Sequence, residues 1–202
     1  MCGLSWLWNW WENTSYYFNG TTKSIIFLGI DNAGKTTIQY ALTSNYFFIN
    51  KNPKDASNSF TLNNVHFFLK GFKVYRGIMY SYKQWIESSD CIIYVVDSGD
   101  HQRLEESKNE LFNILSKYNL EDKPILIYAN KQDLPHSLGI DELIEKLDLN
   151  NIPQSNSWLI QPCSVITKFG ILEGIEWIID GCPSNPKRFK TVKSAKSIIH
   201  SR

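Results

Sequence analysis

Apolar and polar residues follow two different periods along the middle of this chain, and these periods predict strands and helices in turn. Continuous apolar runs with polar residues on both sides predict buried strands at 24–28, 91–97, 124–129 and 158–161. Two apolar runs split by Asn63-Asn64 predict a β-hairpin over 59–62 and 65–69. Helical spacing predicts helices at 37–44, 103–118, 141–147 and 171–179. The polar stretch 49–59 predicts a mobile loop. Alternating strands and helices predict an α/β fold with a mostly parallel central sheet and helices on both faces.

The two ends of the chain differ from this middle part. Residues 1–20 hold four of the seven tryptophans, and on a helical wheel their apolar side chains cover a wide arc. Tryptophan favours the headgroup boundary of a bilayer, so this segment predicts an amphipathic helix lying on a membrane. The alternative is a helix packed in a groove of its own domain. Residues 182–202 carry six Lys and Arg and no acid, which fits either binding to anionic lipid or a solvated, disordered tail. A single domain over 21–181 lies between these ends.

Composition narrows the class of protein. A net charge of +1 provides no strong field for nucleic acid, so we expect no nucleic-acid partner. The four cysteines (Cys2, Cys91, Cys163 and Cys182) have neither metal-site nor disulfide spacing, which indicates a reducing compartment. No apolar run approaches the roughly 20 residues needed to cross a bilayer, and no secretory signal is visible. We expect a cytoplasmic chain.

The most specific motif follows the first predicted strand. It fits the pattern G-x-x-x-x-G-K-[ST] and reads Gly29-Ile30-Asp31-Asn32-Ala33-Gly34-Lys35-Thr36-Thr37. The glycines let the backbone curl so that several N–H groups point at phosphate oxygens, and the helix that follows adds its partial positive charge. Residues 31–37 are therefore the candidate phosphate-binding set. Within it, Lys35 would reach the β- and γ-phosphates, and the Thr36 hydroxyl would bind Mg²⁺. The alternative is a glycine-rich turn without function.

A second motif, Asn130-Lys131-Gln132-Asp133, follows the strand that ends at Ala129. The Asp133 carboxylate would accept two hydrogen bonds from N1 and N2 of guanine, a donor pair that adenine lacks. We expect the stem of Lys131 to pack on the base and Asn130 to tie this loop to the phosphate loop. A polar loop without function is the alternative, and it would have to coincide with the first motif.

With these two motifs the chain resembles the Arf/Sar branch of the small GTPases, over roughly residues 22–180. Further matching runs are Val95-Val-Asp-Ser98, Ala129-Asn-Lys-Gln-Asp-Leu-Pro135, Trp158-Leu-Ile-Gln-Pro-Cys-Ser164 and Leu172-Glu-Gly-Ile-Glu-Trp177. Arf-like and Sar-like features occur together, so the subfamily stays open. The resemblance implies the P-loop NTPase fold, GTP or GDP with Mg²⁺ as ligands, and guanine contacts from Cys163 and Ser164. It also implies that the Trp-rich N-terminal helix is exposed on GTP binding.

The chain departs from this family where GTP hydrolysis is controlled. The family carries Asp-x-Gly-Gly-Gln (or His) after the hairpin, and the aligned residues are Gly71, Phe72, Lys73, Val74 and Tyr75. Tyr75 therefore replaces the residue that orients the attacking water. The family's Pro-Thr, whose Thr completes the Mg²⁺ shell, aligns with Lys51-Asn52. We expect nucleotide binding with slow or absent hydrolysis, and no catalytic residue is assigned.

Two functions remain open at this point. The first is a monomeric GTP-controlled switch for vesicle-mediated protein transport, a peripheral membrane protein at the Golgi or endoplasmic reticulum with an exchange factor and a coat or effector protein as partners. The second is a nucleotide-stabilised module that presents a constant binding surface. A P-loop ATPase or kinase is a third reading, which Asp133 argues against.

Overall fold

The computed structural model describes residues 21–44, 58–70 and 79–182. Within them, the strands are β1 (Thr22–Leu28), β2 (Ser59–Leu62), β3 (Val65–Lys70), β4 (Cys91–Asp97), β5 (Ile125–Asn130) and β6 (Trp158–Pro162). The α-helices are α2 (Lys35–Thr43), α3 (Met79–Glu87), α4 (Leu104–Lys117), α5 (Ile140–Lys146) and α6 (Ile171–Ile179). Two short 3₁₀ helices are η2 (His101–Arg103) and η3 (Leu149–Asn151).

The strands form one sheet in the order β2-β3-β1-β4-β5-β6. Pairing is antiparallel between β2 and β3 and parallel at every other neighbour. The predicted α/β fold with a mostly parallel sheet is confirmed. In the register of β4 and β5, the last residues of the two strands are partners, Asp97 opposite Asn130. Ligands of such sheets bind beyond the carboxyl ends of the strands, which is where these two residues lie.

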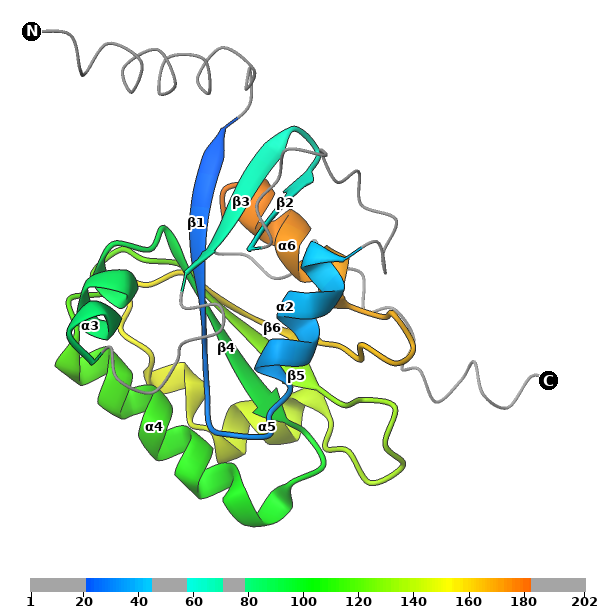
Figure 1. Cartoon of the computed structure of the whole chain (residues 1–202). Helices are drawn as coiled ribbons and strands as arrows, with labels where there is room; N and C mark the ends of the chain where they lie inside the picture. Colours follow the sequence, from blue (N-terminus) through cyan, green and yellow to red (C-terminus); the bar gives the residue numbers. More distant parts are fainter. Residues whose placement is uncertain (1–20, 45–57, 71–78, 183–202) are drawn as a thin grey trace, which may run out of the picture.

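Helices cover both faces of the sheet, as Figure 1 shows. On one face, α2 and α6 pack on side chains such as Phe27, Ile93 and Tyr128. On the other face, α3, α4 and α5 pack on side chains such as Leu28, Tyr94 and Ile127. Every residue of β4 and β5 is buried, as expected for parallel strands covered on both sides. The two apolar layers fix the strand ends that carry the candidate site.

The observed strands and α-helices follow the predicted ones closely, with one α-helix omitted. The helix α3 was not predicted, because Met-Tyr-Ser-Tyr-Lys-Gln-Trp-Ile-Glu is rich in residues of modest helix propensity and has no long apolar stripe. The helix after the phosphate loop begins at Lys35 instead of the predicted Thr37. The helix predicted at 103–118 is observed as α4, and its first predicted residue, Arg103, ends the preceding η2. In the described part of the chain, no helix has the length and hydrophobicity required to span a membrane.

Several predictions fall on residues outside the described ranges. They are the amphipathic helix at 1–20, most of the loop at 49–59, the substituted switch positions 71–75, and the basic tail apart from Cys182. These remain predictions from the sequence.

Candidate functional site

The phosphate loop connects β1 to α2, and two of its glycines are required by close contacts. Gly29 has a φ of +126°, and a Cβ at this residue would lie 2.4 Å from the Val95 carbonyl oxygen. Gly34 has a φ of +103°, and a Cβ there would lie 2.2 Å from Nδ2 of Asn130. Both distances are too short for any side chain. The loop therefore curls tightly against the ends of β4 and β5, as the motif predicted.

Lys35 reaches back across the curve of this loop. Its Nζ donates hydrogen bonds to the carbonyl oxygens of Gly29, at 2.8 Å, and Ile30, at 2.5 Å. Burial lowers the pKa of the Lys35 ammonium, and the nearby Asp31 carboxylate opposes that shift. Ala33 is buried, whereas Thr36 and Thr37 are exposed in the first turn of α2. A cation thus lies beside the N-terminus of the helix α2, an arrangement suited to an anionic ligand.

Asn130 joins the second loop to the first. Its Nδ2 donates a 2.9 Å hydrogen bond to the Ala33 carbonyl oxygen, which confirms the predicted tie between the two loops. Its Oδ1 accepts a contact of 3.8 Å from the Cys163 thiol. Asn130 is only 4% exposed. Three segments that are far apart in the sequence therefore meet at one buried amide.

The predicted guanine-binding residues also meet. The Ser164 hydroxyl donates a 2.5 Å hydrogen bond to Oδ1 of Asp133, and the Gln132 N–H donates to the Cys163 carbonyl oxygen at 3.1 Å. Cys163 and Ser164 are fully buried. Burial raises the pKa of the Cys163 thiol well above its usual value, so this thiol stays protonated. These hydrogen bonds join the two segments. The Ser164 hydroxyl contacts only one of the two carboxylate oxygens of Asp133.

Asp97 holds Lys131, a contact that was not predicted. The Lys131 ammonium lies 2.6 Å from Oδ2 of Asp97, while Oδ1 accepts the Gly99 N–H at 3.0 Å. The Asp97 side chain is 8% exposed and that of Lys131 is 30% exposed, so this ion pair is only partly shielded from water. In the sequence, Asp97 and Asn130 stand at the carboxyl ends of two buried apolar runs. Parallel pairing of these two strands would have placed the ends side by side.

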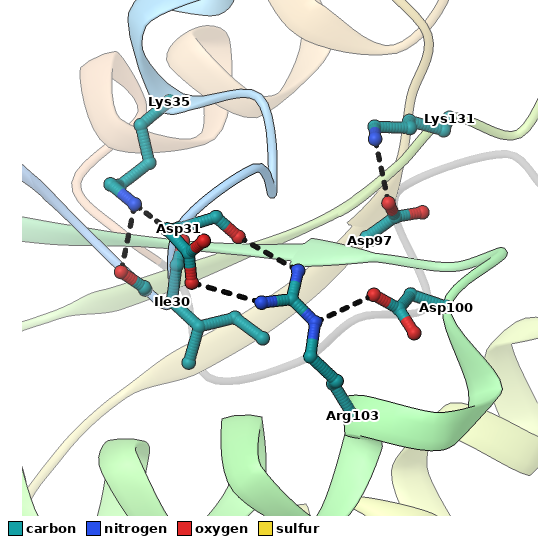
Figure 2. Close-up of polar contacts among 8 residues, drawn as sticks. Ile30, Asp31, Lys35, Asp97, Asp100, Arg103 and Lys131 are labelled. Carbon is teal, nitrogen blue, oxygen red and sulfur yellow. Dashed lines mark hydrogen bonds and ion pairs between the residues drawn. The ribbon is translucent and has the colours of Figure 1, made fainter.

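A second unpredicted cluster surrounds Arg103 and contacts Asp31 of the phosphate loop. Figure 2 shows the Arg103 guanidinium between Asp31 and Asp100. Its NH1 donates to Oδ1 of Asp31 at 2.9 Å, its NH2 to the Asp31 carbonyl oxygen at 3.1 Å, and its Nε to Oδ2 of Asp100 at 2.8 Å. Hydrogen bonding to Arg103 lowers the pKa of the Asp100 carboxyl. Arg103 was not predicted as a site residue, because its contact with Asp31 joins residues 72 positions apart.

A magnesium ion would find one predicted protein ligand here, the exposed Thr36 hydroxyl. Within the ranges that the structure describes, no three His, Cys, Asp or Glu side chains gather closely enough to hold a metal ion. Magnesium is commonly held by few protein groups together with phosphate oxygens and water. Among the described residues, the donor set therefore fits Mg²⁺ bound together with phosphate oxygens better than a metal held by protein groups alone.

Comparison with known proteins gives one consistent result. The model of the ADP-ribosylation factor family matches residues 14–182. ADP-ribosylation factor-like protein 3 of Chlamydomonas reinhardtii is 38% identical over 157 residues, covering 77% of this chain and 88% of the relative. Human ADP-ribosylation factor-like protein 5A is 32% identical over 164 residues, covering 80% and 90%. ADP-ribosylation factor J of Dictyostelium discoideum is 33% identical over 170 residues, covering 83% and 89%.

Proposed function

Because this chain belongs to the ADP-ribosylation factor family of small GTPases, we propose that it holds GTP or GDP between the two loops described above. The observation that carries the proposal is the Asn130 amide, which joins the phosphate loop to the base-reading loop through Ala33. The two motifs thus form one site of fixed spacing. A nucleotide needs its base and its phosphates to be bound at that spacing at the same time.

Each end of the nucleotide has its own set of residues. The phosphates would be bound by Lys35 and the loop amides of residues 31–37, and Thr36 would contribute to holding Mg²⁺. The base would be bound by Asp133, with Lys131 along its face and the Cys163–Ser164 backbone at its carbonyl oxygen. The hydrogen bond from Ser164 supports this role, because it fixes the orientation of the Asp133 carboxylate.

Hydrolysis of the bound GTP is proposed to be slow or absent. The support lies in the sequence at residues 71–75, where Gly-Phe-Lys-Val-Tyr replaces the family's Asp-x-Gly-Gly-Gln or His. Phosphoryl transfer depends on placing a water molecule and on neutralising charge, and Tyr75 offers no group that orients the water in the same way. Nucleotide affinity rests on other residues and should be retained.

At the cellular level we propose a switch for vesicle-mediated protein transport. The Trp-rich segment 1–20 would attach the chain to the surface of the Golgi or endoplasmic reticulum when GTP is bound, with an exchange factor and a coat or effector protein as partners. The support is the tryptophan content of that segment together with the family membership. We propose a monomer without nucleic-acid partners.

The substitutions at 71–75 favour a second function, a nucleotide-stabilised module that binds its partner constantly. Limited proteolysis distinguishes the two. A switch changes its cleavage pattern between GDP and a non-hydrolysable GTP analogue, whereas a constant module gives the same pattern with both.

Nucleotide content after purification tests the site directly. We expect GDP or GTP to be released from the denatured protein in close to equimolar amount, followed by slow single-turnover hydrolysis of GTP loaded with Mg²⁺. The variant Lys35→Ala serves as a control for adventitious nucleotide. Recovery of an empty protein that takes up neither GDP nor GTP at millimolar Mg²⁺ contradicts the proposed binding, and fast hydrolysis contradicts only the proposed rate.

A further inference from the structure

Arg103 contacts the phosphate loop from outside both nucleotide motifs. One guanidinium binds the side chain and the main chain of the same loop residue, Asp31, and is itself anchored by Asp100. The planar fork of arginine presents these donors in fixed directions, which a lysine ammonium does not reproduce. Arg103 therefore fixes both the path of the loop at Asp31 and the direction of its carboxylate (Figure 2).

The charges around Asp31 explain why that direction matters. The Asp31 side chain is 85% exposed and borders an open depression of about 780 Å³. Glu106 and Glu110 of α4 line the same depression. An Asp31 side chain released by Arg103 has room to move, and these two carboxylates repel it. Lys35, the proposed phosphate ligand, is close enough for the Asp31 charge to influence its pKa.

We propose that Arg103 is a positioning residue of the nucleotide site, one that turns the Asp31 carboxylate aside and neutralises it so that the loop accepts a triphosphate. The inference rests on the proposed nucleotide binding. Without Arg103, the phosphate loop carries an unpaired negative charge beside the phosphates. GTP has one more phosphate group than GDP, so GTP affinity falls further than GDP affinity.

A double-mutant cycle tests this role. We expect Arg103→Gln to lower the affinity ratio of GTP over GDP about fivefold, the order expected for one added phosphate charge near an exposed and partly screened carboxylate. In the Asp31→Asn background, the same Arg103 substitution should change the ratio less than about twofold, because the repelling charge is gone. Raising the salt from about 0.05 M to about 0.5 M should shrink the effect in the single variant.

The measurements are titrations of fluorescent GDP and of a fluorescent non-hydrolysable GTP analogue, with thermal unfolding to confirm folding. If Arg103→Gln does not fold, Asp100→Asn loosens the same guanidinium from its other side, and a smaller change in the same direction is expected. Equal losses for both nucleotides, without rescue by Asp31→Asn, would mean that Arg103 only holds the loop in shape and would overturn the inference. A wild-type protein that binds neither nucleotide overturns the proposed function and the inference together. If the wild type binds both nucleotides normally but the Arg103 and Asp31 substitutions change the affinity ratio independently of each other, the inference alone is overturned.

Discussion

Gly34→Ala is the substitution that tests the joint between the two loops most directly. The added Cβ would lie 2.2 Å from Nδ2 of Asn130, at a backbone φ of +103°. Positive φ costs a non-glycine residue about 1–2 kcal/mol. Displacing the Asn130 amide from the Ala33 carbonyl oxygen costs about 1–2 kcal/mol more, because both groups are buried. We expect the free energy of unfolding to fall by about 2–4 kcal/mol.

The matched control is Gly181→Ala. Gly181 has a φ of +82°, and a Cβ there meets nothing within 4 Å. This variant carries the backbone cost without the steric one, so we expect a loss of about 1 kcal/mol and unchanged nucleotide affinity. Urea unfolding of nucleotide-stripped protein and titration with fluorescent GDP measure the two effects. We expect GDP affinity to fall at least about tenfold in Gly34→Ala, since about 1.4 kcal/mol of strain at the loop is enough. If the two variants prove equally stable and bind GDP equally well, the proposed joint has no energetic role.

Three other substitutions or conditions probe separate parts of the molecule. Asp133→Asn should reduce the preference for GDP over ADP at least about tenfold, because an amide cannot accept both guanine N–H bonds; competition titrations measure it. Asp97→Asn should speed GDP release and lower the free energy of unfolding by about 1 kcal/mol. The loss of stability stays small because the Lys131 side chain is 30% exposed and partly regains water when its partner is lost. The substitution Glu121→Gln, at an exposed residue, is the control. Burial raises the pKa of the Cys182 thiol to about 11 from an ordinary 9.0, so the folded chain holds this proton more tightly than the unfolded chain. The resulting stabilisation is complete below pH 9 and is lost as the pH rises towards 11, and Cys182→Ser should make that decline in unfolding free energy shallower.

Each of these predictions has an outcome that contradicts it. Unchanged base preference in Asp133→Asn would mean that another group reads the base. An Asp97→Asn protein that matches Glu121→Gln in stability and in GDP release would mean that the ion pair with Lys131 contributes nothing. A decline above pH 9 that is identical with and without Cys182 would assign it to other groups, such as the buried thiols of Cys91 and Cys163.

Local pattern was sufficient to predict most of the fold. The run Cys91–Asp97 is continuous and apolar because both faces of β4 are covered, and its bounds were predicted without error. The helix α3 left a weaker signal, since it is only nine residues long and its clearest core residue is Ile86, which is fully buried. Its place depends on packing against the sheet, which the residues of α3 alone do not encode.

The candidate site divides in the same way. Residues within each motif were predicted because their spacing is local, and even the tie from Asn130 to the phosphate loop was anticipated. The partners that hold these residues were missed: Asp97 for Lys131, Ser164 for Asp133, and Arg103 for Asp31. Each of these contacts spans at least 31 positions along the chain. Such contacts depend on the order and register of the strands, which a single sequence shows only indirectly.

The pairing of Asp97 with Asn130 at the ends of β4 and β5 has a practical consequence. One residue inserted within either strand would reverse which side chains face each layer. It would also shift the register, so that Asp97 and Asn130 would no longer lie opposite each other. The turn at Glu121 and Asp122, where both side chains are exposed before β5 begins, is free of that constraint. A fluorescent label or a short peptide tag placed at this turn should leave the paired ends of β4 and β5 undisturbed, which makes it the preferred attachment point for following this protein in a cell.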